Sequence, residues 1–143
     1  MDSRTGSPHD GARAHLADLV ADAAGRTPDQ AAIIDVTSAV TLAWAEFDGA
    51  VSAEAVRLRT AGITSGDRVL VRLGNGAAFC VAVLGALRAG AVVVPVGPPA
   101  VARELDIVLD DCRPAAVVAA EGDDVARGCA AGRGALVLAP PDP

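Results

Sequence analysis

One stretch, Leu84–Gly97 (LGALRAGAVVVPVG), constrains the fold of this chain more than any other. The run 77–87 that leads into it carries no charge, which predicts a helix that is apolar on nearly all sides. Gly90 can adopt the left-handed conformation that ends a helix, because it has no Cβ. The valines at 92–94 favour a strand covered on both faces, and Pro95 ends it because proline cannot donate to a ladder. The stretch therefore predicts a helix–strand unit in the middle of an α/β layer structure.

The rest of the C-terminal half continues this alternation. The sequence predicts strands at 69–73, 92–96, 115–120 and 135–139, and helices at 75–89, 100–111 and 123–130. Strands joined by helical crossovers form a parallel sheet with right-handed connections. The predicted fold class is α/β, with a parallel, doubly wound sheet flanked by helices.

Before this sheet the sequence predicts a helix, a hairpin and a longer helix. Segments 31–36 and 39–42 predict two short strands joined at Thr37-Ser38, and the longer helix covers about 44–61. Periodicity assigns one buried face to each of three helices. These faces comprise Leu16, Leu19, Val20 and Ala23; then Phe47, Ala50, Val51, Ala55 and Leu58; then Val101, Leu105, Val108, Leu109 and Cys112.

Charge and hydropathy exclude several classes of function. The net charge is −6, all twelve basic residues are arginine, and no basic patch is present, so nucleic-acid binding is not expected. The segment 77–97 is long enough to cross a bilayer, but Arg88 near its middle costs about 2.5–3.5 kcal/mol on insertion. We therefore expect no membrane span. The polar N-terminus has no apolar secretory region, so the expected location is the cytoplasm.

Three groups of residues suggest chemistry, and each has a simpler structural explanation. Gly74-Asn75-Gly76 follows a strand and opens a helix, where phosphates often bind, but Phe79 stands where a dinucleotide fingerprint needs glycine or alanine. We favour a scaffold turn there. Asp110-Asp111 and Asp123-Asp124 are neighbouring carboxylates that point to different sides of a helix, so we interpret them as solvated surface.

Cysteine and histidine give no pattern for a metal or a nucleophile. The three cysteines, Cys80, Cys112 and Cys129, are unpatterned, and free buried thiols in a reducing compartment are expected. The only histidines, His9 and His15, lie in or beside the polar N-terminal segment, far from any cysteine. We assign no catalytic, cofactor-binding or metal-binding residue.

Three ordered segments resemble the adenylate-forming enzymes, which include acyl-CoA ligases, luciferases and the adenylation domains of peptide synthetases. The stretch LRAGAVVVPVG is similar to their second core motif, and 41–47 (TLAWAEF) to their first. Segment 61–73 (AGITSGDRVLVRL) resembles the part between. The family normally places threonine at the position of Ala43, three residues before Glu46, so this chain lacks one half of a capping box.

The resemblance implies the first subdomain of the large domain of such an enzyme. On this basis residues 1–13 are a disordered tail, 14–139 an incomplete N-terminal AMP-dependent synthetase/ligase subdomain, and 140–143 a linker-like end. The complete family enzyme uses ATP, Mg and coenzyme A to form an acyl-adenylate and then a thioester. Its phosphate-binding loop and its lysine are absent from this chain, which contains no lysine, so no cofactor is expected to bind the chain alone.

Four hypotheses remain for the chain itself. We favour a fragment or split piece of a carboxylate-activating ligase of the acyl-CoA ligase type, inactive alone. A piece of a peptide-synthetase adenylation domain is the alternative within the family. The other two hypotheses are a complementing subunit that docks onto a separately encoded remainder of the ligase, and a stand-alone α/β binding module. The expected partners are the remaining part of a split ligase or a second copy of this chain.

Overall fold

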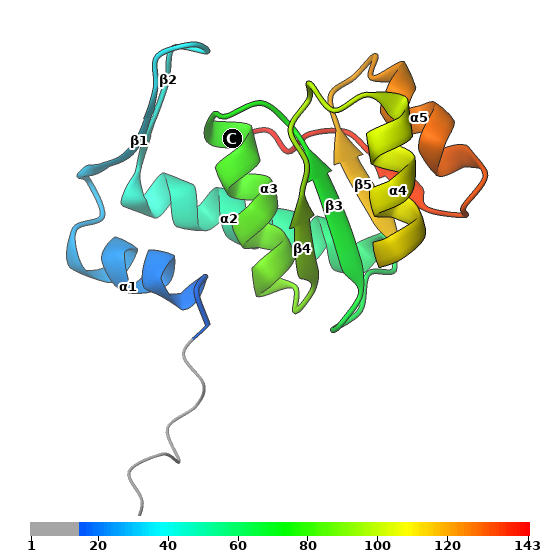
Figure 1. The fold of residues 1–143 in the computed structure, drawn as a ribbon. Helices are drawn as coiled ribbons and strands as arrows, with labels where there is room; N and C mark the ends of the chain where they lie inside the picture. Colours follow the sequence, from blue (N-terminus) through cyan, green and yellow to red (C-terminus); the bar gives the residue numbers. More distant parts are fainter. Residues whose placement is uncertain (1–14) are drawn as a thin grey trace, which may run out of the picture.

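The structure, a computed structural model, describes residues 15–143 (Figure 1). The predicted tail at 1–13 lies outside the described residues. Helices and strands occur in the predicted order, with bounds that differ by one to two residues at most ends. The elements are α1 (Asp18–Arg26), β1 (Ala31–Asp35), β2 (Val40–Ala43), α2 (Trp44–Thr60), β3 (Arg68–Arg72), α3 (Ala77–Arg88), β4 (Val92–Pro95), α4 (Ala102–Cys112), β5 (Ala116–Ala119), α5 (Asp124–Ala131) and β6 (Leu136–Leu138).

Four strands form a parallel sheet in the order β4-β3-β5-β6, with helices on both faces (Figure 1). The side chains of β3 alternate between two cores. Val69 and Val71 pack with α2 and α3 on one face, whereas Leu70 packs with α4 and α5 on the other. All three are fully buried, as expected for a strand with neighbours on both sides and helices above and below. The predicted doubly wound α/β fold is confirmed.

The stretch 84–97 forms the predicted helix, turn and strand, but not in the middle of the sheet. Gly90 is in the left-handed region, with a φ of 89°. β4 is an edge strand, and Val92 is 51% exposed. Val93 and Val94 contact the two different cores, so the run of valines correctly indicated cover on both faces. The run of valines does not indicate how many strands lie beside it. The central strands of the sheet are β3 and β5.

The hairpin β1–β2 is a separate antiparallel sheet of two strands, as predicted. It projects from the body beside the ends of α2 and α3 (Figure 1). Ala39, next to the predicted turn, has a positive φ of 57°, which is unusual for a residue with a Cβ. The hairpin contacts α2 and α3 at its base. Among the described residues, no third strand pairs with it.

The predicted buried faces are right for α2 and only partly right for α1 and α4. On α2 the face is buried apart from Ala50, which is half-buried. Around α1, Leu16 and Leu19 are more than half exposed, because Ala17 and Val20 make the contact instead. On α4, Leu105 and Leu109 are fully buried, with Val108 and Cys112 half-buried. Val101 is exposed because it precedes the helix as its N-cap.

The last residues return across the body after β6. The Arg57 guanidinium donates to the Ala139 carbonyl at 3.1 Å, and Pro141 is buried beside α2. The same arginine forms a bidentate pair with the carboxylate of Glu54, which is only 2% exposed. Periodicity had not placed a carboxylate in the core, and Arg57 supplies the charge that Glu54 needs there.

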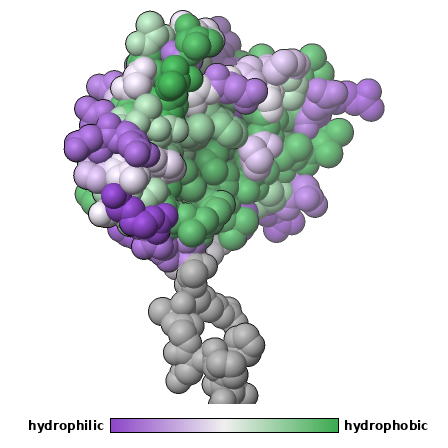
Figure 2. Space-filling view, turned by 90° about the vertical axis from the view of Figure 1, so that its left-hand side faces the viewer, coloured by the Kyte–Doolittle hydropathy of each residue, from purple (hydrophilic) through white to green (hydrophobic). Residues whose placement is uncertain are grey.

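Apolar side chains gather on the side of the molecule that carries α1 and the hairpin (Figure 2). The exposed large ones on or next to these elements are Leu16, Leu19, Ile34 and Val36. Among the described residues, every helix is too short or too polar to traverse a bilayer.

Candidate functional site

The carboxyl edge of the parallel sheet is the candidate site of this fold. The chain passes from β3 to β4 on one side and then to β5 on the other, so the winding direction changes at β3. Open α/β sheets bind ligands beyond the carboxyl ends of their strands at such a point. Three segments meet there: the turn 74–76 after β3, the loop 96–101 after β4, and residues 120–123 after β5.

The Gly74-Asn75-Gly76 turn receives a carboxylate from the hairpin. Oδ2 of Asp35 accepts the backbone N–H of Ala77, the first residue of α3, at 3.1 Å. A Cβ on Gly76 would lie 2.6 Å from the same oxygen, so a larger residue here would displace the Asp35 carboxylate. The carboxylate thus fills the position at which a phosphate would bind a helix start. This arrangement accords with a scaffold turn.

Hydrogen bonds hold the Asp35 carboxylate in its charged form. Oδ1 accepts the backbone N–H groups of Thr37 and Ser38 at 3.0 and 3.2 Å. Hydrogen bonds from the Ser38 side chain, from the Ala77 N–H and from the turn backbone lower the pKa of Asp35 to about 2. The group is therefore an anion at any physiological pH, and it links the hairpin to α3.

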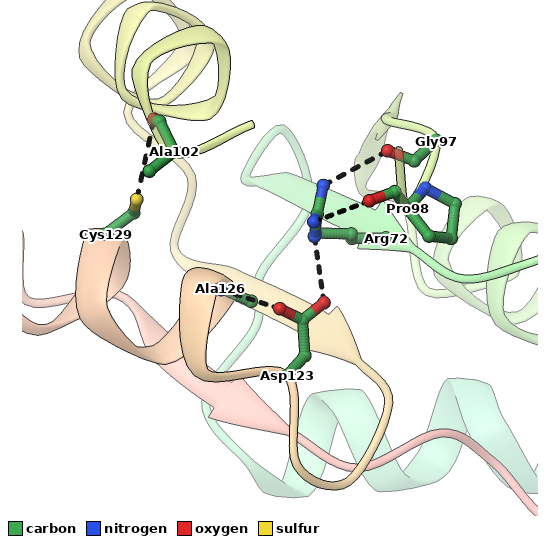
Figure 3. A network of polar contacts seen from close by, with 7 residues as sticks. All are labelled: Arg72, Gly97, Pro98, Ala102, Asp123, Ala126 and Cys129. Carbon is green, nitrogen blue, oxygen red and sulfur yellow. Dashed lines mark hydrogen bonds and ion pairs between the residues drawn. The ribbon is translucent and has the colours of Figure 1, made fainter. Parts of the chain in front are cut away.

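A buried ion pair joins the end of β3 to the segment that follows β5. Nε of Arg72 lies 2.8 Å from Oδ2 of Asp123, and the two side chains are 5% and 14% exposed (Figure 3). Oδ1 of Asp123 accepts the N–H of Ala126 at 2.9 Å and caps α5. The prediction of solvated surface is wrong for Asp123 and right for Asp124, which is 92% exposed. The missed signal was Arg72, the one charge in the predicted strand 69–73.

The other carboxylate pair lies on the surface of α4. Oδ1 of Asp110 is 2.7 Å from Nε of Arg133, whose Nη1 also contacts Asp106 at 2.8 Å. The hydrogen bond from Arg133 lowers the pKa of Asp110, against an opposing effect of desolvation. Asp111 is exposed and is not part of this cluster. The cluster joins α4 to the end of α5, and it agrees with the predicted solvated surface.

The three thiols are free. Cys129 is buried on α5, and its Sγ lies 3.7 Å from the carbonyl oxygen of Ala102 (Figure 3). Cys80 and Cys112 are half-buried. Desolvation is the largest effect on all three, and it raises their pKa values, which favours the protonated and unreactive thiol. Within residues 15–143 no cluster of histidine, cysteine and acidic side chains has the arrangement of a metal site, and His9 lies outside them.

Each of the helices α2–α5 carries a carboxylate of this chain at its start. Besides Asp35 and Asp123, Glu46 accepts the N–H of Ala43 at 2.8 Å, and Glu104 accepts that of Val101 at 3.1 Å. Helix starts are the usual anion sites of such folds. The residues described here therefore do not fit the phosphates of ATP, since those positions already hold negative charge.

Arg88, the charged residue of the LRAGAVVVPVG stretch, joins three helices. Its guanidinium donates to the carbonyl of Ala17 before α1, and to Ser52 Oγ, Asp48 Oδ1 and the Asp48 carbonyl of α2, at 2.7–3.1 Å. The ion pair with Asp48 is largely shielded, with side chains 19% and 29% exposed. The motif residue thus has a structural role in the described part of the chain.

A small cavity opens at the same edge of the sheet. It has a volume of about 340 Å³ and lies between the ends of β3 and β4, where Asn75, Phe79 and the loop 97–99 line it. Its mixed lining of an amide, an aromatic ring and prolines offers contacts to a neutral group and no charge.

Residues 20–139 match the family described as AMP-binding enzyme. The chain belongs to this family. The match covers the α/β unit from the middle of α1 to the residue after β6, and it confirms the resemblance to adenylate-forming enzymes drawn from the three sequence segments.

Individual relatives share this part of the chain. The chain is 42% identical over 90 residues to a salicyl-AMP ligase / salicyl-S-ArCP synthetase of Mycobacterium tuberculosis, covering 61% of the chain and 16% of that protein. It is 37% identical over 89 residues to a plipastatin synthase of Bacillus subtilis, covering 62% of the chain and 2% of that protein. The chain therefore spans a small part of the length of these relatives.

A solved relative has the same arrangement of elements. ATP-bound MatB from Rhodopseudomonas palustris superposes with a TM-score of 0.78 at 26% identity, over 87% of this chain and 25% of MatB. The fold described above is thus the fold of about one quarter of MatB.

Proposed function

We propose that this chain is the N-terminal scaffold part of a carboxylate-activating ligase of the acyl-CoA ligase type. The family match over residues 20–139 carries this proposal. In the complete protein a carboxylate oxygen attacks the α-phosphorus of ATP, pyrophosphate leaves, and a thiol then displaces AMP from the acyl-adenylate. The relatives extend well beyond the part that this chain matches, and we place ATP, Mg and coenzyme A binding there.

The polar contacts within the chain support a scaffold role. The starts of α2–α5 are occupied by the chain's own carboxylates, and the arginines described above donate to carboxylates or to backbone carbonyls. No lysine is present to contact a leaving pyrophosphate. We therefore expect the isolated chain to have no adenylate-forming activity.

Carboxylate-dependent ATP–pyrophosphate exchange tests this expectation. The purified chain, tested with fatty, aryl and amino acids, should remain at the background rate. Exchange that rises above background and co-purifies with the chain would contradict the proposal, because the residues needed would then lie within these 143 positions.

A chimera tests the scaffold role positively. In the salicyl-AMP ligase, the 90 matched residues are replaced by those of this chain. We expect a folded chimera that keeps salicylate-dependent exchange at a reduced rate, because the transplanted part does not touch the reacting atoms. A folded chimera with no exchange would show that this part of the ligase contributes more than a scaffold.

Similarity to plipastatin synthase supports a second candidate within the family, a part of a peptide-synthetase adenylation domain. The two candidates differ in the thiol acceptor, which is coenzyme A for one and a carrier-bound thiol for the other. A complementing subunit and a stand-alone α/β binding module are the remaining alternatives. The complementing subunit is distinguished by stable co-purification with a separately encoded remainder, which a plain fragment would not show.

A further inference from the structure

Arg72 is the most buried arginine side chain among the ion pairs described, and the proposed scaffold role does not by itself explain it. It ends the central strand β3, with its side chain 5% exposed. All three of its nitrogens donate hydrogen bonds, to three different residues from two segments of the chain (Figure 3). A buried guanidinium is costly unless each donor is satisfied, so this arrangement needs all its partners in place.

One of the two segments is the loop after β4. Nη1 of Arg72 donates to the carbonyl of Gly97 at 3.1 Å, and Nη2 donates to that of Pro98 at 2.7 Å. Pro98 and Pro99 have no N–H with which to attach the loop to the body. Within the loop itself, the N–H of Ala100 bonds the Gly97 carbonyl at 3.1 Å. The N–H of Val96 bonds the Val71 carbonyl of β3 at 2.9 Å, and beyond that residue Arg72 is the polar link between this loop and the central strand.

The other segment is the start of α5. Asp123 uses one carboxylate oxygen to accept from Nε of Arg72 and the other to accept from the Ala126 N–H. The same carboxylate therefore caps α5 and fixes the orientation of the guanidinium. If Asp123 moves, Arg72 loses the contact that aims its other two nitrogens at the loop.

We propose that Arg72 couples the loop after β4 to the start of α5, so that the two segments move as one unit at the carboxyl edge of the sheet. The planar guanidinium reaches both segments at once through three separate nitrogens, whereas lysine has a single nitrogen and can replace only part of these contacts. The loop of this unit forms one wall of the cavity of about 340 Å³, since Gly97 and Pro98 line it. Arg72 therefore acts as a positioning residue for the edge at which open α/β sheets bind ligands.

Amide hydrogen exchange on the whole chain tests the coupling with the variants Arg72→Met, Arg72→Lys and Asp123→Asn. Asp123→Asn keeps an oxygen for the Ala126 N–H but removes the charge that holds Arg72. We expect it to raise exchange about tenfold at Ala100, whose N–H bonds the Gly97 carbonyl and which Asp123 does not bond. Arg72→Met should raise exchange in both segments, and Arg72→Lys should do so to a smaller extent.

Arg68→Met is the matched control. Arg68 lies at the opposite end of β3 and donates to the carbonyls of Cys112 and Arg113. This variant should raise exchange at 112–115 and leave the loop 97–101 unchanged. Unchanged exchange at 97–101 in Asp123→Asn would overturn the coupling. A uniform rise in Arg72→Met that includes Leu70 and Val117 would also overturn it, because Arg72 would then act on overall stability alone.

Discussion

Arginine side chains link distant parts of this chain by donating to backbone carbonyls, and no lysine shares this role. A guanidinium carries five donors in a fixed plane, so one side chain can satisfy several carbonyls that a strand or helix end leaves open. The donor–acceptor pairs are Arg57 with Ala139, Arg59 with Arg88, Arg68 with Cys112 and Arg113, Arg72 with Gly97 and Pro98, and Arg88 with Ala17 and Asp48.

Arg88 gives the sharpest prediction for a single residue. Arg88→Met should lower the free energy of unfolding by about 2–3 kcal/mol, because the partly buried carboxylate of Asp48 and the Ala17 carbonyl lose a charged donor. Arg88→Lys should lose less, since it keeps the charge but not the fork. Urea denaturation provides the measurement, with the exposed Arg103→Met as control. Equal denaturation midpoints for Arg88→Met and the control would show that the four hydrogen bonds of Arg88 make no net contribution to the free energy of unfolding.

At the level of elements, two helices start with half of a capping box. Glu46 and Glu104 accept the N–H of the N-cap residue, but alanine and valine at the N-caps offer no oxygen in return. In α2, backbone carbonyls of Gln30 and Pro28 already accept the first two N–H groups. A new hydroxyl should therefore help α4 more than α2.

Val101→Thr tests this difference. Threonine has nearly the shape of valine, and Val101 is 59% exposed, so little burial is lost. The hydroxyl should cap α4 and stabilise the chain by about 0.5–1 kcal/mol, with a smaller gain for Ala43→Thr. Thermal unfolding checks both, and Val101→Ala controls for the loss of the methyl groups. A larger gain at Ala43 than at Val101 would mean that the carbonyls of Gln30 and Pro28 do not cap α2.

The contact between the hairpin and α3 should depend on pH. The pKa of Asp35 falls from 3.8 to about 2 on folding, so its contribution to stability is fully present above about pH 4 and is lost as the pH falls towards 2. Asp35→Asn should remove this part of the acid sensitivity. The measurement is the difference in denaturation midpoint between wild type and variant from pH 6 to pH 2.5. A difference that stays constant over that range would contradict the contact.

The order and type of the elements could be predicted because apolar periodicity and the glycine at position 90 are local signals. The place of β4 at the sheet edge could not, since a run of valines reports cover on the faces and not the number of neighbours. The contacts of Asp35 and Asp123 could not be predicted from the sequence either. Their partners, Ala77 and Arg72, are distant in sequence, and only the packed sheet brings them together.

At the level of the whole molecule, the described unit exposes apolar groups at both sheet edges and on the hairpin. Val92 begins β4, Leu136 and Val137 belong to β6, and Ile34 and Val36 lie on or next to β1. Unpaired edges with apolar side chains favour association with another chain, and salt screens the net charge of −6 beyond about 8–10 Å.

We therefore expect the chain to self-associate at micromolar concentration. Light scattering, together with binding of a hydrophobic dye, provides the measurement. Val36→Lys and Val137→Lys should each reduce scattering, whereas Arg103→Lys, on the exposed surface of α4, should not. A wild-type monomer that does not bind the dye would favour the stand-alone module over a part of a larger enzyme.

The order of strands in the sheet also determines when the chain can fold. The central strand β3 is the first of the four to be synthesised, and Val69 finds its partners only at Val93 and Ala116. Arg57 must wait longer still, for the carbonyl of Ala139. Parallel pairing across such separations makes folding slow relative to helical domains. On the ribosome, the apolar strand β3 therefore lacks its full set of neighbours while more than forty further residues emerge, and it is in this interval that a chaperone has most to bind.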